Sequence, residues 1–173
     1  MNAYRNRLLG LVAGEDVYAI LEDTPQRVSD LFSGIGDAGL SRRFGPGKWT
    51  AREVFCHLAD VEVGTGFRIR QIATSTGQHI IQPFDQDLWA KPYARLPARA
   101  AVTAFSALRP YNLAWYRTLP AEDLSRVAFH PERGDESIET IIRMQAGHDR
   151  NHLAQLESIA AASEKGGAAS EKG

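Results

Sequence analysis

The stretch Thr50–Glu62, TAREVFCHLADVE, contains the clearest helix start in this sequence of 173 residues. Thr50 and Glu53 fit a capping box, in which the threonine hydroxyl accepts from a backbone amide and the glutamate side chain reaches back to the cap. Apolar residues then recur at helical spacing, so we predict a helix that continues to about Ser75. His57 lies on the apolar face of this helix, one turn after the cap.

Other segments carry the same helical periodicity. Thr24 and Pro25 suit the cap and the first position of a helix, which we expect to end at the glycines within residues 34–39. Pro110 should kink the helix that contains it. Period-two alternation is not sustained anywhere, so we expect little or no sheet. The remaining predicted helices are Glu15–Glu22, Ala98–Leu119 and a segment from Ser137 to about Ile159.

Four amphipathic helices joined by two long connections predict an all-α fold, a four-helix bundle. The connections cover residues 77–97 and 120–136. Both are longer than the usual loop of about 4 to 6 residues, which suggests a functional or covering role. We assign residues 1–162 to one helical-bundle domain. Residues 163–173, SEKGGAASEKG, read as a flexible polar tail.

Composition excludes several classes of partner. The net charge is −1 and the Lys and Arg residues form no basic run, so we expect no nucleic-acid partner and no membrane partner. No segment reaches the roughly 18 apolar residues of a membrane span, and the N-terminus lacks a signal-peptide core. The single cysteine, Cys56, fits a reducing cytoplasm. We therefore expect a cytoplasmic protein that acts on a small molecule.

His148 and His152 are four residues apart on a predicted helix, so both imidazoles lie on one face about one turn apart. They also fall on the apolar stripe of that helix, between Gln145 and Leu156. Two buried imidazoles side by side are costly unless a partner satisfies them, and a metal ion does this well. The alternative is that both histidines are half-exposed at a helix end.

His57 favours the metal interpretation. Alone it would be a core histidine with a hydrogen-bonded partner, but from a facing helix it completes a three-histidine site with His148 and His152. Three protein ligands leave a coordination position open for water or substrate, which is the catalytic pattern. The ion could be zinc, nickel, iron or manganese, because three imidazoles discriminate poorly between them.

Several nearby residues are candidates for supporting roles. Asp60 shares the face of His57 and could orient an imidazole, move a proton or bind the metal, or else be a surface carboxylate paired with an arginine. By helical phase, Glu62 and Asp149 read as surface charges. His130 could approach the site from a long connection and take part in catalysis, although a solvated loop histidine is the simpler interpretation.

Other residues and motifs give no catalytic signal. His79 lies in the first long connection and has the same simple interpretation as His130. Cys56 is about 100° around the helix from His57 and reads as a small buried residue. The sequence contains no nucleophile elbow, no P-loop and no dinucleotide-binding glycine motif after a strand.

Two motifs resemble those of the DinB-like (DinB/YfiT) proteins. Gly47–Glu62, GKWTAREVFCHLADVE, resembles their second-helix signature, and Ala146–Glu157, AGHDRNHLAQLE, resembles their last-helix signature. The stretches QPFDQDLWA and HPERG are similar to connections in one branch of the family, so the likeness covers most of residues 10–160. It implies a four-helix bundle with a metal held at positions matching His57, His148 and His152. It also implies homodimers.

Characterised members of that family include thiol S-transferases that use bacillithiol and mycothiol-dependent isomerases. Our leading hypothesis is therefore a metal-dependent transferase for a low-molecular-weight thiol, in which the metal stabilises the thiolate. The second hypothesis is metal-assisted hydrolysis with Asp60 as the general base. The third is a non-catalytic metal-binding module of a stress response.

Overall fold

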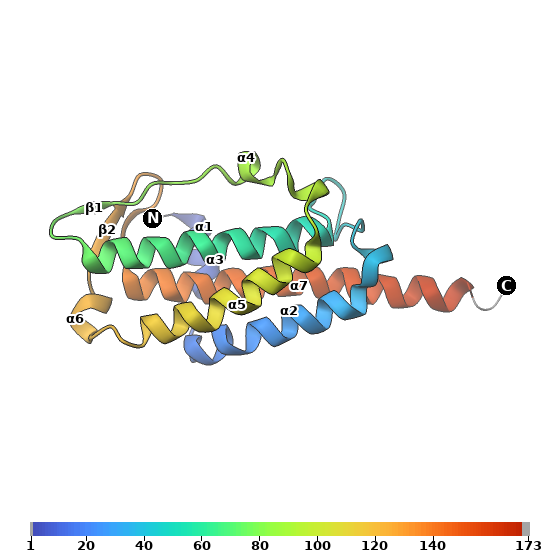
Figure 1. The fold of residues 1–173 in the computed structure, drawn as a ribbon, viewed down its shortest axis with the longest axis horizontal. Helices are drawn as coiled ribbons and strands as arrows, with labels where there is room; N and C mark the ends of the chain where they lie inside the picture. The colour runs from blue at the N-terminus through green and yellow to red at the C-terminus, as the bar shows by residue number, and fades with distance from the viewer. Residues whose placement is uncertain (1, 171–173) are drawn as a thin grey trace.

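Four long helices lie side by side in the computed structural model, which describes residues 2–170, with side chains to residue 162 (Figure 1). Helix α2 packs against α5 and α7, and α3 packs against the same two helices. The predicted four-helix bundle is confirmed. The four helices are α2 (Val17–Gly39), α3 (Ala51–Thr74), α5 (Ala98–Tyr116) and α7 (Ile138–Ser170).

Shorter elements surround the bundle. They are α1 (Ala3–Gly10), β1 (His79–Ile80), α4 (Gln86–Ala90), the 3-10 helix η1 (Tyr93–Arg95), α6 (Ala121–Leu124), β2 (Val127–His130) and β3 (Gly134–Ser137). No helix among the described residues has the length and apolar character needed to cross a membrane. Helix α7 enters the segment expected to be a tail, and residues 171–173 lie outside the described part of the chain.

The predicted capping box forms at the start of α3. The Thr50 hydroxyl accepts from the Glu53 amide at 3.2 Å, and the Glu53 carboxylate accepts from the Thr50 amide at 2.6 Å. Two orphan amides of the first helical turn are thereby satisfied. The helix ends at Thr74, one residue before the expected end.

The predicted helix break before Pro25 is wrong. Helix α2 begins at the cap Asp16, which accepts from two amides, and it continues through Pro25. Thr24 is not a cap, because its hydroxyl donates to the Ile20 carbonyl one turn earlier at 2.8 Å. A continuous buried face, including Leu21 and Val28, outweighs the local cost of the proline. The kink within α2 instead falls at Gly36, where φ is +62°.

Contrary to the expectation of little or no sheet, the structure contains a small three-stranded sheet in the order β1-β2-β3. β2 and β3 form an antiparallel hairpin in which His130 pairs with Gly134, and β1 runs parallel to β2. Strands of two and four residues are too short to give a sustained alternating pattern. The second long connection is therefore partly ordered as a hairpin, and it brings His130 to the bundle.

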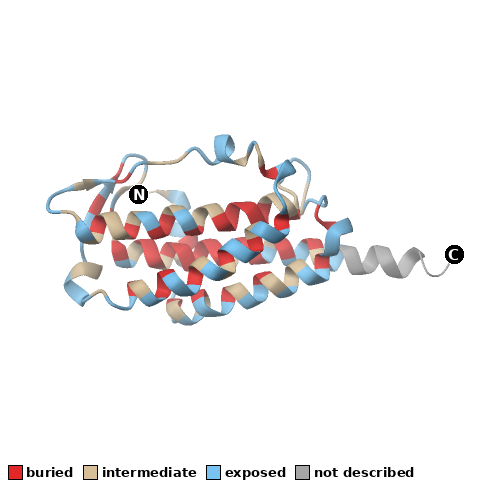
Figure 2. Ribbon diagram, in the orientation of Figure 1, coloured by how far each residue is buried: buried red, intermediate tan, exposed pale blue. Residues whose placement is uncertain are grey.

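The sequence pattern also gave no indication of helix α1. Only Leu8 of this helix is buried, so it has almost no apolar stripe. It packs against α7 where Gly147 leaves room, since a Cβ at that position would overlap the Leu8 carbonyl. Buried residues recur along all four long helices (Figure 2), and their apolar side chains form the core.

Candidate metal centre

The three predicted histidines lie together inside the bundle. His57 comes from α3, and His148 and His152 come from successive turns of α7. One ring nitrogen of each lies within 4.8 Å of the others, and the Nε2 atoms of His57 and His148 are 3.0 Å apart. All three side chains are buried.

Burial keeps these imidazoles in the form that binds a metal. Loss of solvation, together with the neighbouring His152, lowers the pKa of His57 to about 3. Burial likewise lowers the pKa of His152 to about 4 and holds the pKa of His148 well below 6.5. All three rings are therefore neutral at pH 7, with lone pairs available to a cation.

Neighbouring side chains hold the rings in place. Nδ1 of His152 is 2.9 Å from the amide oxygen of Gln155, so this nitrogen carries the proton and Nε2 is free to bind. The Trp49 ring stacks on His152 and meets His57 edge-on. This aromatic side chain closes one side of the cluster and orients two of its three members.

The geometry and chemistry of the cluster fit a divalent transition metal. Two Nε2 atoms face each other across 3.0 Å, while Nδ1 of His57 and of His148 has no partner among the described residues. Buried nitrogens in this arrangement are poorly satisfied by one another. A metal that bonds nitrogen at about 2.1 Å holds its ligand atoms roughly 3 to 4 Å apart, so an ion fits between these rings.

The cluster borders a cavity of about 660 Å³, which His57 and His148 both line. Its apolar wall comes from α3, the first long connection and α7, through Val61, Phe84, Ile141 and Met144. Polar side chains occupy the rest: Thr65, Arg68, His130, Arg133, Glu136 and Gln145 are among them. A small molecule could enter this space and approach two of the three histidines.

Asp60 is bound to a tyrosine. Its carboxylate accepts from the Tyr93 hydroxyl at 2.5 Å, and it does not line the cavity. Burial and this hydrogen bond raise the pKa of Tyr93, so the phenol remains protonated and donates. Among the described residues no arginine pairs with Asp60, so the alternative of an arginine-paired surface carboxylate does not hold.

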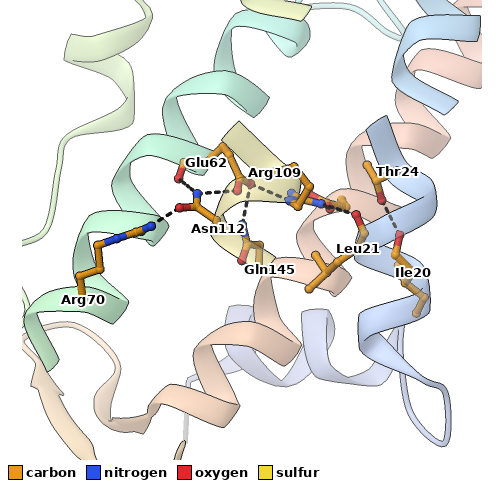
Figure 3. A network of polar contacts seen from close by, with 9 residues as sticks. Ile20, Leu21, Thr24, Glu62, Arg70, Arg109, Asn112 and Gln145 are labelled. Atoms are coloured by element: carbon orange, nitrogen blue, oxygen red, sulfur yellow. Dashed lines mark hydrogen bonds and ion pairs between the residues drawn. The ribbon is translucent and has the colours of Figure 1, made fainter. Parts of the chain in front are cut away.

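The prediction that Glu62 and Asp149 are surface charges is wrong. Both are buried, with exposures of 0% and 1%, and both pair with Arg109 of α5. The Arg109 guanidinium donates to Glu62 at 2.8 Å (Figure 3). It also donates to Asp149 at 2.6 Å. Each bundle helix contacts two neighbours, so its buried arc is wider than one stripe. The available signal was Arg109 itself, at helical spacing between Phe105 and Leu113.

This network also fixes a cavity side chain. Gln145 donates through its amide nitrogen to the Glu62 carboxylate at 2.7 Å. Because an ionised carboxylate only accepts, the amide nitrogen must face Glu62 and the amide oxygen must point elsewhere. That oxygen is buried and has no partner among the described residues. Gln145 therefore presents an unpaired acceptor within the wall of the cavity.

The remaining candidates have separate positions. His130 lies on β2, is buried and lines the cavity, so it is not a solvated loop histidine. His79 lies on β1 and does not line the cavity. Cys56 is buried as predicted, and burial raises the pKa of its thiol to about 11, which disfavours a nucleophilic role.

The chain is thus a helical bundle in which three buried histidines could hold a metal ion beside a cavity. This chain belongs to the DinB superfamily, whose family model matches residues 20–156. The resemblance noted in the sequence is thus confirmed.

Similar sequences come from bacteria. The chain is 30% identical over 140 residues to an Oceanobacillus iheyensis protein named "putative metal-dependent hydrolase", with 80% of this chain and 81% of that protein covered. It is 26% identical over 140 residues to a Bacillus cereus protein of the same description, with 80% of each covered. Both names describe a metal-dependent hydrolase.

Solved structures share the fold. YfiT from Bacillus subtilis, described as a "probable metal-dependent hydrolase with an unusual four-helix bundle topology", matches with a TM-score of 0.79 at 22% identity over 86% of each chain. A mycothiol-dependent maleylpyruvate isomerase matches with a TM-score of 0.67 at 12% identity, over 90% of this chain and 63% of the other. At these identities the likeness shows the fold alone.

Proposed function

We propose that this protein is a metal-dependent enzyme that transfers a low-molecular-weight thiol to an electrophilic small molecule. The observation that carries the proposal is the cluster of His57, His148 and His152, neutral, buried and open to a cavity on one side. When bound, a divalent ion would supply Lewis acidity that lowers the pKa of a thiol or a water molecule.

In this proposal the chain contributes ligands, orientation and a shielded space. Three neutral imidazoles leave the full charge of the ion uncompensated, which favours an anionic sulfur beside it. Trp49 and Gln155 hold the ligand rings in one orientation. The apolar wall of the cavity excludes water around the reacting groups, which strengthens the attraction between ion and thiolate.

Thiol transfer needs fewer catalytic groups from the protein than hydrolysis does, because it does not need a dedicated general base. A thiol near a cation ionises at neutral pH without a dedicated base. The carboxylate of Asp60 is held by Tyr93 and lies outside the cavity lining. The candidate general base is therefore committed to another partner, which supports thiol chemistry as the first choice.

The test is conjugation of a model electrophile by purified protein. Protein loaded with zinc, nickel, iron or manganese is mixed with bacillithiol, mycothiol or glutathione and with monochlorobimane. We expect a metal-dependent rate with at least one thiol, and no such rate for the His148→Ala variant. If no thiol gives a rate above that of the variant, thiol transfer fails as the function.

The second candidate is metal-dependent hydrolysis, favoured by the names of the bacterial relatives. It predicts turnover of an activated ester or amide in the absence of any thiol. If Asp60 leaves Tyr93 and acts as the general base, replacing it by Asn should abolish that turnover while sparing thiol transfer. Metal binding without any turnover would instead support the non-catalytic stress-response module.

The predicted homodimer and the cytoplasmic location stay predictions. Light scattering after size-exclusion chromatography would test the first, since a dimer has twice the mass of the 19.1 kDa chain. A monomeric mass at micromolar concentration would contradict it.

A further inference from the structure

Arg68 places a positive charge on the cavity wall without a carboxylate partner. It lies on α3, and its guanidinium donates to the Gln82 carbonyl at 3.3 Å and stacks over the Phe84 ring at 5.0 Å. Across the described residues it makes no ion pair. The half-buried guanidinium of Arg68 therefore has no ion-pair partner to offset its loss of solvation.

The second arginine of the wall is neutralised. Arg133 donates to both carboxylate oxygens of Glu136, at 2.6 and 2.8 Å, and Glu136 is buried. Burial lowers the pKa of Arg68 and the nearby Arg133 lowers it further, while Glu136 offsets part of this effect. Of the two arginines, Arg68 is the one without an ion pair of its own, and an incoming anion would relieve its repulsion with Arg133.

His130 adds a neutral donor to the same wall. Its Nδ1 accepts from the Glu132 amide at 3.2 Å, which places the proton of the neutral ring on Nε2. No partner for Nε2 is present in the part of the chain that the structure describes. The N–H group is therefore available to a ligand in the cavity.

Two other carboxylates line the cavity without neutralising Arg68. Asp85 caps α4 and accepts from the amides of Asp87 and Leu88 at 2.9 and 3.0 Å. Glu132 is exposed to solvent. The lining holds two arginines and three carboxylates, so an anion is favoured only directly at Arg68, and a monoanion is favoured over a dianion there.

Arg68 and His57 share one face of α3. They are eleven residues apart, which corresponds to about three turns and a rise of roughly 16 Å. Val61 and Thr65 lie between them on this face and also line the cavity. An elongated ligand could therefore contact Arg68 at one end and approach the histidines at the other.

We propose that the substrate of this site carries a carboxylate on an apolar body, and that Arg68 and the Nε2–H group of His130 bind that carboxylate. The planar guanidinium matches a carboxylate in shape and charge. The apolar side chains of Val61, Ile141 and Met144 would pack against the body of the molecule. This inference rests on the proposed function, because only an enzyme has a substrate, but its test measures binding and requires no turnover.

The experiment compares two probes of the same shape, 4-phenylbutyrate and the uncharged 4-phenylbutanamide, by isothermal titration calorimetry with the zinc-loaded protein. We expect the wild type to bind the acid roughly tenfold more tightly than the amide, as for one charge-assisted contact. Arg68→Gln should remove this preference, and Arg68→Lys should retain part of it. Equal affinities of the wild type for both probes would overturn the proposal.

The matched control is Arg52→Gln. Arg52 also lies on α3 and donates to a carbonyl of the same connection, that of Leu96 at 2.9 Å, but it does not line the cavity. Its loss should leave the preference for the acid unchanged. If Arg52→Gln removes the preference as fully as Arg68→Gln, the effect belongs to the connection and the proposal is overturned.

A carboxylate could also bind the metal directly, so both probes are titrated into the metal-free protein as well. We expect the preference for the acid to persist there and to depend on Arg68. A preference that vanishes with the metal and survives in Arg68→Gln would overturn the proposal. Absence of turnover with every thiol would reject the proposed function and leave these binding results standing, so the two failures are distinguishable.

Discussion

Few groups in the bundle can form hydrogen bonds with the ring nitrogens of His57, His148 and His152. One pair of nitrogens can share one proton, but Nδ1 of His57 and of His148 is left without a partner. Each unsatisfied buried polar atom costs about 1 to 3 kcal/mol. A cation between the rings would accept one lone pair from each and replace the unfavourable contact between the facing Nε2 atoms, so we expect metal occupancy to depend on all three side chains.

Elemental analysis of the purified protein checks this expectation. We predict about one divalent metal per chain for the wild type, as in other three-histidine sites, and a loss of at least about tenfold in occupancy for each of the alanine variants at 57, 148 and 152. His79→Ala, outside the cluster, should retain the metal. A wild type that remains metal-free after zinc, nickel, iron and manganese are added back would refute the metal site.

At this scale the sequence predicted the cluster because His148 and His152 are four residues apart on one helix and His57 follows a capping signal on another. It could not predict the pairing of Glu62 and Asp149 with Arg109, because the phase of one helix does not show which neighbours surround it. Nor could it predict that Tyr93 binds Asp60, since the two residues are brought together only by the folded connection.

At the scale of elements, Gly147 determines how closely α1 approaches α7. A methyl group at this position would overlap the backbone of Leu8, which cannot move without shifting the whole of α1. Asn2, Tyr4 and Leu8 line the cavity, so a shift of α1 would also open it. The glycine in the last-helix motif thus has a packing role that its helix position alone does not suggest.

Gly147→Ala should lower the free energy of unfolding by about 1 to 3 kcal/mol, as overpacking does. Gly34→Ala in α2 is the control, because no atom lies within 4 Å of the added Cβ, and alanine there should be neutral or stabilising by up to about 1 kcal/mol. Urea unfolding measures both. Equal stability of the two variants would contradict the close packing of α1 on α7.

Arg109 connects three helices of the bundle through its buried ion pairs with Glu62 and Asp149. Asp149→Ala leaves the guanidinium partly unpaired in a region that water does not reach. We expect a loss of about 3 to 5 kcal/mol in the free energy of unfolding, the usual cost of breaking a buried pair. Chemical denaturation of the metal-free protein measures this loss without a contribution from metal binding at the neighbouring histidines.

The control for the Asp149 variant is Glu22→Ala. Glu22 pairs with Arg117 between α2 and α5, but both side chains are about half exposed. Screening by water and salt limits such a pair to roughly 0 to 1 kcal/mol. A loss for Asp149→Ala as small as that for Glu22→Ala would show that the buried network does not stabilise the bundle.

For the whole molecule, the sequence predicted the bundle because four long helices carry strong periodic signals. The capped α3 and the histidine-bearing α7 are the clearest cases. The small sheet and α1 were missed because short elements gain their stability from contacts with the finished bundle rather than from local pattern. These same short elements, through His130 and Leu8, complete the cavity.

Global stability should depend on pH through the buried histidines. In the unfolded chain a histidine titrates near 6.5, whereas burial lowers the pKa of His57 to about 3 and that of His152 to about 4. Between these values the unfolded chain binds protons that the folded protein does not. The free energy of unfolding therefore decreases as pH falls below about 6.5, by up to about 1.4 kcal/mol per pH unit for each histidine.

Urea unfolding of the metal-free protein between about pH 7.5 and pH 5 measures this dependence. Carboxylates also titrate at the acid end, so the comparison between variants isolates the histidine contribution. His57→Gln should reduce the loss of stability on acidification, because one proton-binding group disappears from the unfolded chain. His79→Gln should leave most of the loss in place. If the two variants respond alike, protonation of the buried cluster does not control the stability of this bundle.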